Sequence, residues 1–251
     1  MTLGEPEPES PGRAPDSLYA TPRDAERFRF DAEVASVFQD MVERSVPGYV
    51  SLIHGIAVLG GKYAQTGATC YDLGCSLGTA ARALGTRMGP EHPVLAIDSS
   101  SDMIARCARV PGASVQYHCA DIREWSLESA DVVVLNLTLQ FLPPEDHLPL
   151  LQRIARALRP GGVLILTEKV RFDDPEEDLV QKRYESFKRA RGYSELEISQ
   201  KRTALEQVLA RDTPATHRER LTAAGFDSIT VWFQCLHFIS MLAIRQNATP
   251  S

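Results

Sequence analysis

The chain has 251 residues, of which 43% are hydrophobic and 24% are charged, an ordinary composition for a globular protein with one sizeable domain. Its net charge of −6 argues against the basic footprint of a nucleic-acid-binding protein, and no apolar run reaches the roughly 20 residues of a membrane span. The first ten residues lack the basic start and apolar stretch of a secretory signal, and the five cysteines form no C-x-x-C pair. We therefore expect a soluble, cytoplasmic protein with reduced thiols, and no nucleic acid or membrane as a direct partner.

The first thirty residues differ in composition from the rest of the chain. Four prolines lie among glutamates within the first 15 residues, and few large apolar side chains accompany them. A segment of this kind cannot bury enough apolar surface to offset the entropy that it loses on ordering. We predict that residues 1–30 form a mobile tail, most clearly up to about Ser17, and that residues 31–251 form a single α/β domain.

Two helices are predicted at the start of this domain. The first is amphipathic, because its apolar residues recur at helical spacing: Val34, Val37, Phe38, Met41 and Val42. It ends near Ser45–Gly48, and a second helix follows at about Tyr49–Tyr63.

The chain then alternates between short apolar strands and helices. Five strands are predicted at Thr69–Leu73, Val94–Asp98, Val115–Ala120, Asp131–Leu135 and Gly162–Thr167. Their nearly continuous apolar character is typical of parallel strands that are covered on both faces. Helices are predicted at Ser101–Arg109, at Pro144–Leu158, along a polar stretch from Glu168 to about Arg211, and at Pro214–Ala224. With a closing antiparallel pair at Ile229–Gln234 and Phe238–Ile244, the pattern predicts a doubly wound, mostly parallel seven-stranded sheet with N-terminal helices.

A glycine-rich turn follows the first strand, within Asp72–Thr79. In a doubly wound sheet this turn lies beside the crevice where ligands bind. Glycines there let the backbone approach a ligand closely and leave N–H groups free to face it. Ser76 stands where a dinucleotide fingerprint has its second glycine, which argues against a nicotinamide or flavin cofactor.

Polar side chains also end the next three strands. Asp98 ends the second strand, where a carboxylate can accept both hydrogen bonds of a ribose diol. After the third strand, Asp121 is suited to an adenine amino group and Ile122 to covering the ring, and Asn136 ends the fourth strand. Each aspartate alone can equally be a turn residue or a helix cap, but the ordered set indicates a nucleotide-like ligand.

This layout resembles that of class I S-adenosylmethionine-dependent methyltransferases, and the chain is further similar to the carboxy-S-adenosylmethionine synthase family. The likeness runs from about Asp31 to Arg245. The stretches that carry it are Val37–Tyr49, Tyr71–Gly78, Val132–Phe141, Arg189–Arg202 and Trp232–Cys235.

The resemblance implies a reaction, a set of partners and a fold. The expected reaction converts S-adenosyl-L-methionine and prephenate to carboxy-S-adenosyl-L-methionine and phenylpyruvate. Such enzymes form homodimers, and their product passes to a separate tRNA carboxymethyltransferase that modifies a wobble uridine to 5-oxyacetyl uridine. The expected fold is the class I methyltransferase fold, and S-adenosyl-L-methionine is a substrate.

The resemblance also implies the site residues. Contacts with S-adenosylmethionine are expected from Tyr49, Gly74, Cys75, Ser76, Asp98, Ser99, Asp121, Ile122 and Asn136. Arg202 matches the arginine that holds the transferred carboxylate, from its own subunit or across a dimer, and is the one residue with a direct part in catalysis. Ser99 departs from the asparagine that is familiar at its position, although a hydroxyl group can still form a hydrogen bond. The six histidines show no metal-ligand spacing, so no metal is expected.

Several alternatives stay open at this point. Tyr49 can be a core aromatic, and the Cys75 thiol can be a nucleophile, although a backbone contact and apolar packing of its side chain are favoured. Seven basic against three acidic residues between Gln181 and Arg202 suit an anionic substrate, or form a solvated helix face. The whole chain can instead be an ordinary methyltransferase for a small acid, or a carrier that binds the carboxylated compound without making it.

Overall fold

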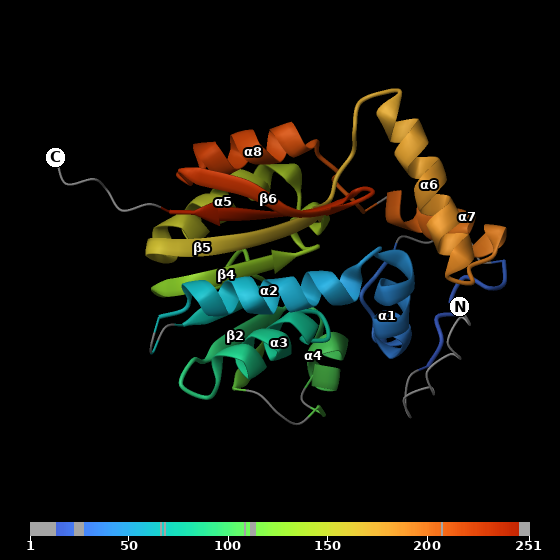
Figure 1. Ribbon diagram of the computed structural model, residues 1–251. Helices are drawn as coiled ribbons and strands as arrows, with labels where there is room; N and C mark the ends of the chain where they lie inside the picture. Colours follow the sequence, from blue (N-terminus) through green and yellow to red (C-terminus); the bar gives the residue numbers. More distant parts are fainter. Residues whose placement is uncertain are drawn as a thin grey trace, which may run out of the picture.

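The computed structural model describes residues 14–22, 28–65, 67, 69–107, 109–110, 114–206 and 208–245. Its centre is a seven-stranded sheet in the order β3-β2-β1-β4-β5-β7-β6 (Figure 1). The strands are β1 (Cys70–Leu73), β2 (Val94–Asp98), β3 (Val115–Cys119), β4 (Ala130–Asn136), β5 (Leu158–Lys169), β6 (Ser228–Cys235) and β7 (Phe238–Ile244). The first five are parallel and β7 runs antiparallel to both β5 and β6, so the predicted fold class is confirmed.

Helices cover both faces of the sheet and the carboxyl ends of its parallel strands. They are α1 (Ala32–Ser45), α2 (Tyr49–Tyr63), α3 (Thr79–Met88), α4 (Ser101–Cys107), α5 (Pro144–Ala157), α6 (Glu176–Ala190), α7 (Glu195–Glu206) and α8 (Pro214–Ala223), with a short 3₁₀ turn η1 (Leu139–Phe141). Helices α5 and α8 pack on one face of the sheet, and α2 and α3 pack on the other. In Figure 1, α2 runs in front of the strands, and α1, α6 and α7 stand beyond the strand ends. None of these helices combines the length and the apolar character that crossing a bilayer demands.

The alternation of side chains along β4 explains why its sequence is apolar without interruption. Val133 and Leu135 point to one face and join the cluster under α5 and α8. Val132 and Val134 point to the other face and join the cluster under α2 and α3. Because successive residues of a strand face opposite sides, a strand that is covered twice needs apolar residues at every position.

The structure differs from the sequence prediction at the N-terminus. Within the expected mobile tail, residues 14–22 and 28–30 pack against the domain. The Asp16 side chain is 3% exposed and accepts hydrogen bonds from the Tyr193 hydroxyl and the Lys201 ammonium group. Phe28 belongs to an apolar cluster with α1. A buried ion pair and an aromatic anchor order these stretches despite their polar composition; residues 1–13 and 23–27 lie outside the described residues, and the single-domain boundary at residue 31 stays a prediction.

A second difference concerns the long polar stretch after Glu168, which forms two helices. Strand β5 runs on to Lys169, α6 begins at Glu176, and a break separates α6 from α7. Gly192 in that break has φ +86°, which ends a right-handed helix, and the Ser194 hydroxyl accepts a hydrogen bond from the Glu197 amide to begin the next.

Candidate functional site

A cavity of about 680 Å³ lies at the carboxyl ends of the parallel strands. It is lined by nine of the ten predicted site residues, namely Tyr49, Gly74, Cys75, Ser76, Asp98, Ser99, Asp121, Ile122 and Asn136. The tenth, Arg202, is not among the lining residues. Because the sheet order changes direction between β1 and β4, this is the crevice in which doubly wound sheets bind ligands.

The glycine turn after β1 is held by the neighbouring strand β2. Gly74 has φ +77°, and a Cβ atom at this position would lie 2.2 Å from the Thr138 Cγ2 atom, so the turn requires glycine. The amides of Gly74 and Cys75 both donate to the Ile97 carbonyl, at 2.8 and 3.0 Å. The prediction of free N–H groups is therefore wrong for these two residues, because both amides already donate to the end of β2.

Asp98 is fixed by two backbone amides. Its Oδ2 accepts from the Ser76 amide at 2.8 Å and its Oδ1 from the Ser100 amide at 2.9 Å. Burial raises the pKa of this carboxyl group, while both hydrogen bonds oppose the increase. Each carboxylate oxygen keeps a second lone pair, so the geometry suits a diol that donates two hydrogen bonds. Ser99 lies between Asp98 and Ser100, is exposed, and lines the cavity.

Asp121 is less free than the sequence suggests. The Arg123 guanidinium lies 2.6 Å from its Oδ2 and lowers the pKa of the carboxyl group, and the same guanidinium pairs with Asp146 at 3.0 Å. A ligand amino group would share the Asp121 carboxylate with Arg123. Ile122 is 5% exposed beside it and presents an apolar surface to the cavity.

Two oxygen atoms at the cavity wall lack a hydrogen-bond partner among the described residues. They are the buried Oδ1 of Asn136 and the buried Oδ1 of Asp72. The other Asp72 oxygen accepts from the Ala81 amide at 2.9 Å, and burial raises the pKa of Asp72 to about 7. Unpaired buried acceptors cost free energy, so both oxygens favour a ligand that donates hydrogen bonds, such as an ammonium group. The sequence analysis did not assign Asp72 to the site, although it opens the glycine motif.

The structure bears on the open alternatives for Tyr49 and Cys75. Tyr49 is 7% exposed, and its hydroxyl is hydrogen-bonded to Thr79; it belongs to the core and also lines the cavity. The Cys75 side chain is 5% exposed, and its hydrogen bond with Cys107 together with burial raises the pKa of its thiol. A protonated, buried thiol is a poor nucleophile, which supports the packing interpretation.

Arg202 lies outside the cavity of its own chain. Its side chain is 46% exposed, and its Nη1 lies 3.0 Å from Glu185 Oε1. The preceding residue, Lys201, is instead buried and lines the cavity, with its Nζ 3.2 Å from Asp16 Oδ2 and 2.9 Å from Ser45 Oγ. Consecutive helical residues point about 100° apart, so only one of the two can face inward.

The sequence analysis also missed two charged residues at the end of β5. Glu168 is 1% exposed and accepts from the amides of Leu139 and Gln140, each at 3.0 Å; burial nevertheless raises its pKa to about 8. Lys169 lines the cavity, with its Nζ 4.7 Å from the centre of the Tyr184 ring. One feature of the sequence could have indicated them: Glu168 and Lys169 are an adjacent acid and base directly after an apolar strand.

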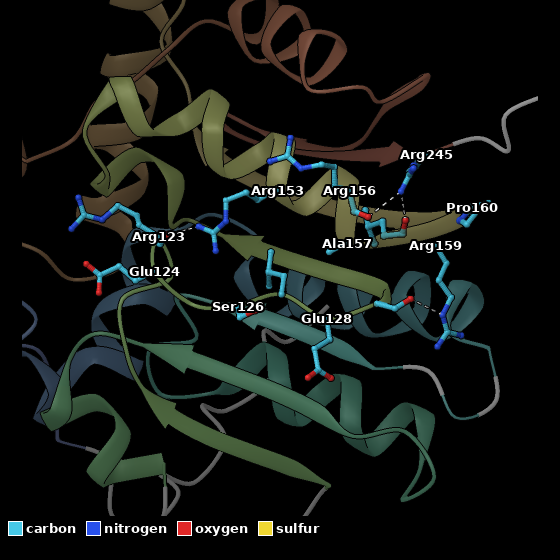
Figure 2. A pocket seen from close by; sticks show the side chains of 13 residues that line it. Arg123, Glu124, Ser126, Glu128, Arg153, Arg156, Ala157, Arg159, Pro160 and Arg245 are labelled. Carbon is cyan, nitrogen blue, oxygen red and sulfur yellow. Dashed lines mark hydrogen bonds between the residues drawn. The ribbon is translucent and has the colours of Figure 1, made fainter.

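A second cavity of about 780 Å³ lies at the opposite, amino ends of β4 and β5, and Figure 2 shows arginines from several segments around it. Two of these arginines form hydrogen bonds to backbone carbonyls of other segments. Arg245 donates to the carbonyls of Ala155 and Leu158 at the end of α5, and Arg153 donates to the carbonyls of Arg123 and Trp125. None of the ten predicted site residues lines this cavity, and we assign it no ligand.

No group of three or more histidine, cysteine, aspartate or glutamate residues in the described part of the chain is arranged to hold a metal ion. The candidate site is the cavity at the carboxyl ends of the strands, because nine of the ten predicted site residues line it.

Known proteins resemble the chain at two levels. A sequence family described as a methyltransferase domain matches residues 71–162. Carboxy-S-adenosyl-L-methionine synthases from Marinobacter nauticus and Geobacter metallireducens are 50% and 49% identical to it; the alignments cover 94% and 92% of this chain and 98% of each relative.

Solved structures share the fold at low identity. Human N-acetylserotonin methyltransferase in complex with SAM is 17% identical, with a TM-score of 0.61 over 86% of this chain and 56% of that one. The plantazolicin methyltransferase BpumL in complex with SAH is 14% identical, with a TM-score of 0.64 over 84% of this chain and 89% of that one. This is the S-adenosylmethionine-dependent methyltransferase fold that the sequence predicts.

Proposed function

Because the chain belongs to the carboxy-S-adenosyl-L-methionine synthase family and is a transferase, we propose that it makes this compound from S-adenosyl-L-methionine and prephenate, releasing phenylpyruvate. The observation that carries the proposal is a single cavity with acceptors at one side and, at the other, an ammonium group without a counter-ion among the described residues. Asp98 and the unpaired oxygens of Asp72 and Asn136 suit the ribose and the amino group of S-adenosylmethionine. Lys169, which also lines the cavity, suits an anionic second substrate.

The reaction balances without a further reactant. Prephenate loses carbon dioxide from its ring carboxylate and hydroxide from its ring, and the ring becomes aromatic as phenylpyruvate forms. The hydroxide takes a proton from the sulfonium methyl group and becomes water. The electron pair left on that carbon attacks the carbon dioxide, and the new carbon–carbon bond completes the carboxylate of the product.

The protein's part is to position both substrates, exclude water and fix charge. Holding the sulfonium methyl group beside the leaving hydroxide and the carbon dioxide replaces encounters in solution by a reaction within one complex. Lys169 offers a cation to a carboxylate of the second substrate. Hydroxide supplies the base, so the mechanism needs no side chain strong enough to deprotonate a methyl sulfonium.

The proposal extends to a homodimer in which Arg202 acts across the subunit interface. Its position outside its own cavity and its exposure support a role toward a partner. Two inactive variants, Asp98→Ala and Arg202→Ala, test this when they are mixed under conditions that exchange subunits. A shared site restores up to about a quarter of the wild-type activity, because a mixed dimer contains one intact site. No restoration would place Arg202 in its own subunit.

We further propose that the product supplies a cytoplasmic tRNA carboxymethyltransferase that acts on a hydroxylated wobble uridine. The net charge of −6 supports a division of labour in which this chain makes the donor and another protein binds the tRNA.

The test is to incubate the purified protein with S-adenosylmethionine, with and without prephenate, and to identify the small molecules by mass. Catalytic formation of a compound heavier by one carboxyl group, with an equal amount of phenylpyruvate, is expected only with prephenate. Methylation of an added acid without this product would establish an ordinary methyltransferase, and stoichiometric binding without turnover would establish a carrier.

Deuterated water tests the source of the base. S-adenosylmethionine that is incubated with the protein in deuterated water should keep its methyl hydrogens when prephenate is absent. Exchange in its absence would show that a group of the protein removes the proton, and the mechanism above would be wrong.

A further inference from the structure

Lys169 is a cation that faces the cavity without an anion from the described part of the chain. It is the last residue of β5, and its backbone amide is fixed by a hydrogen bond to Gln140 Oε1 at 3.0 Å. Its ammonium group lies over the Tyr184 ring and has no hydrogen bond or ion pair with the described residues. Lys201, the other lysine at the cavity wall, differs because it already pairs with Asp16.

The charged groups around Lys169 do not supply the missing anion. Lys188 lies over the same Tyr184 ring, 4.5 Å from its centre, and with Arg211 adds positive charge. Of the nearby acids, Glu177 is engaged by Arg211 at 2.9 Å, and Glu206 is a weaker influence. Burial and the two cations lower the pKa of Lys169 to about 7.

Lys169 is only partly exposed, and an ammonium group that has lost much of its water and has no counter-ion is costly unless a ligand supplies the anion. The neighbouring Tyr184 ring and Phe238 give the same part of the cavity an apolar wall. A small carboxylic acid with an unsaturated ring matches both properties.

We propose that Lys169 binds the side-chain carboxylate of prephenate, the carboxylate that is retained in phenylpyruvate, an inference that rests on the function proposed above. The ring carboxylate is the less suitable partner, because it must lose its charge as carbon dioxide leaves, and an ammonium group bound to it would stabilise the ground state. The retained carboxylate keeps its charge throughout, so Lys169 anchors substrate and product equally.

An interaction made equally in the ground state and the transition state changes KM and leaves kcat nearly constant. Loss of one charge-assisted hydrogen bond should raise the KM for prephenate by about 10- to 100-fold. The inhibition constant of phenylpyruvate should rise by a similar factor, and the Kd for S-adenosylmethionine should not change.

The experiment compares Lys169→Met with Lys188→Met. Both variants remove an ammonium group from the same tyrosine ring, but Lys188 is not among the cavity-lining residues. Steady-state kinetics with both substrates varied, phenylpyruvate inhibition and calorimetric titration of S-adenosylmethionine are measured for each. We expect the large change in prephenate KM only in Lys169→Met, partly reversed in Lys169→Arg. Lys169→Gln gives the same comparison if the methionine variant does not bind S-adenosylmethionine.

A second readout is proton uptake. A carboxylate raises the pKa of the ammonium group it binds, so phenylpyruvate should take up protons on binding near pH 7 to the wild type and not to Lys169→Met.

The outcomes separate the two proposals. An active wild type with an unchanged prephenate KM in Lys169→Met overturns the role of Lys169 and leaves the function intact. A fall in kcat at constant KM also overturns it, because it would place Lys169 at the reacting atoms. Absence of any prephenate-dependent product with the wild type refutes the proposed function and this inference with it.

Discussion

Replacing Gly74 by alanine should damage the site through two separable effects. The first is conformational, because φ +77° places an alanine in the left-handed region, which costs about 1–2 kcal/mol. The second is steric, because the new Cβ would lie 2.2 Å from Thr138 Cγ2, 2.5 Å from Oγ1 and 2.9 Å from Cβ. Overpacking of this kind costs about 1–3 kcal/mol. We expect Gly74→Ala to lower the free energy of unfolding by about 2–5 kcal/mol.

Two further variants isolate these contributions. Gly161→Ala is the matched control, because Gly161 has φ +83° and no atom of the described residues within 4 Å of the place that a Cβ would take, so it should show only the conformational cost. Thr138→Gly removes the three atoms that would lie nearest to the new Cβ at position 74. The double variant Gly74→Ala/Thr138→Gly should therefore be more stable than the sum of the single effects by about 1–3 kcal/mol.

Urea unfolding at equilibrium measures each free energy, and calorimetric titration measures the affinity for S-adenosylmethionine. Gly74→Ala should also weaken this affinity, because Gly74 and Thr138 both line the cavity. A loss below about 0.5 kcal/mol in Gly74→Ala, or additive effects in the double variant, would refute the steric reasoning.

Three further results are expected. Asp98→Asn should lower the affinity for S-adenosylmethionine by about 10- to 100-fold in a calorimetric titration, because the new side-chain NH2 group then faces one of the two backbone amides that donate to the carboxylate. Unchanged affinity would exclude Asp98 as the ribose acceptor. Glu168→Gln should lower the free energy of unfolding in urea at pH 9, where the carboxyl group is ionised, by about 1–3 kcal/mol, since one of the two η1 amides loses its acceptor. A neutral result would show that η1 is held by packing alone. His217 is 3% exposed, and burial lowers its pKa to about 4 from 6.5, with Asp212, Arg220 and His147 around it. The folded state thus binds fewer protons than the unfolded state, so this group should remove about 2 kcal/mol of stability between pH 7 and pH 5. Urea titrations at the two pH values should show a smaller loss in His217→Gln. The loss would be absent from the wild type if the imidazole were protonated in the folded state.

The sequence predicted best those features that depend on local pattern. The bounds of β2 and β7 and the start of α2 agree with the structure, because an apolar run between turn residues determines where a buried strand can lie. Strand-end residues such as Asp98 and Asn136 were placed at one cavity for a related reason: parallel strands bring their carboxyl ends to the same edge.

Features that depend on distant partners were not predictable from pattern. Nothing in the local sequence shows that the Gly74 and Cys75 amides are taken by Ile97. Asp16 lies in a segment whose composition indicates disorder, yet Lys201 and Tyr193 bury its carboxylate. A charge that is unfavourable alone becomes favourable when the fold brings its counter-charge from more than a hundred residues away.

The charged residue types follow the order of the strands. Along the carboxyl edge, β2 carries Asp98, β1 carries Asp72, β4 carries Asn136 and β5 carries Lys169, so the cavity wall changes from acidic through neutral to basic. A cationic nucleoside and an anionic acid would therefore be drawn to opposite ends of one cavity. On the proposed function, the sulfonium methyl group then lies between them, beside the neutral strand, where the released carbon dioxide meets it. On the two proposals together, the fold of a methyltransferase suits carboxylation because its β5 end holds an ammonium group for an acid. Both proposals then meet at one residue, Lys169, whose replacement can be measured.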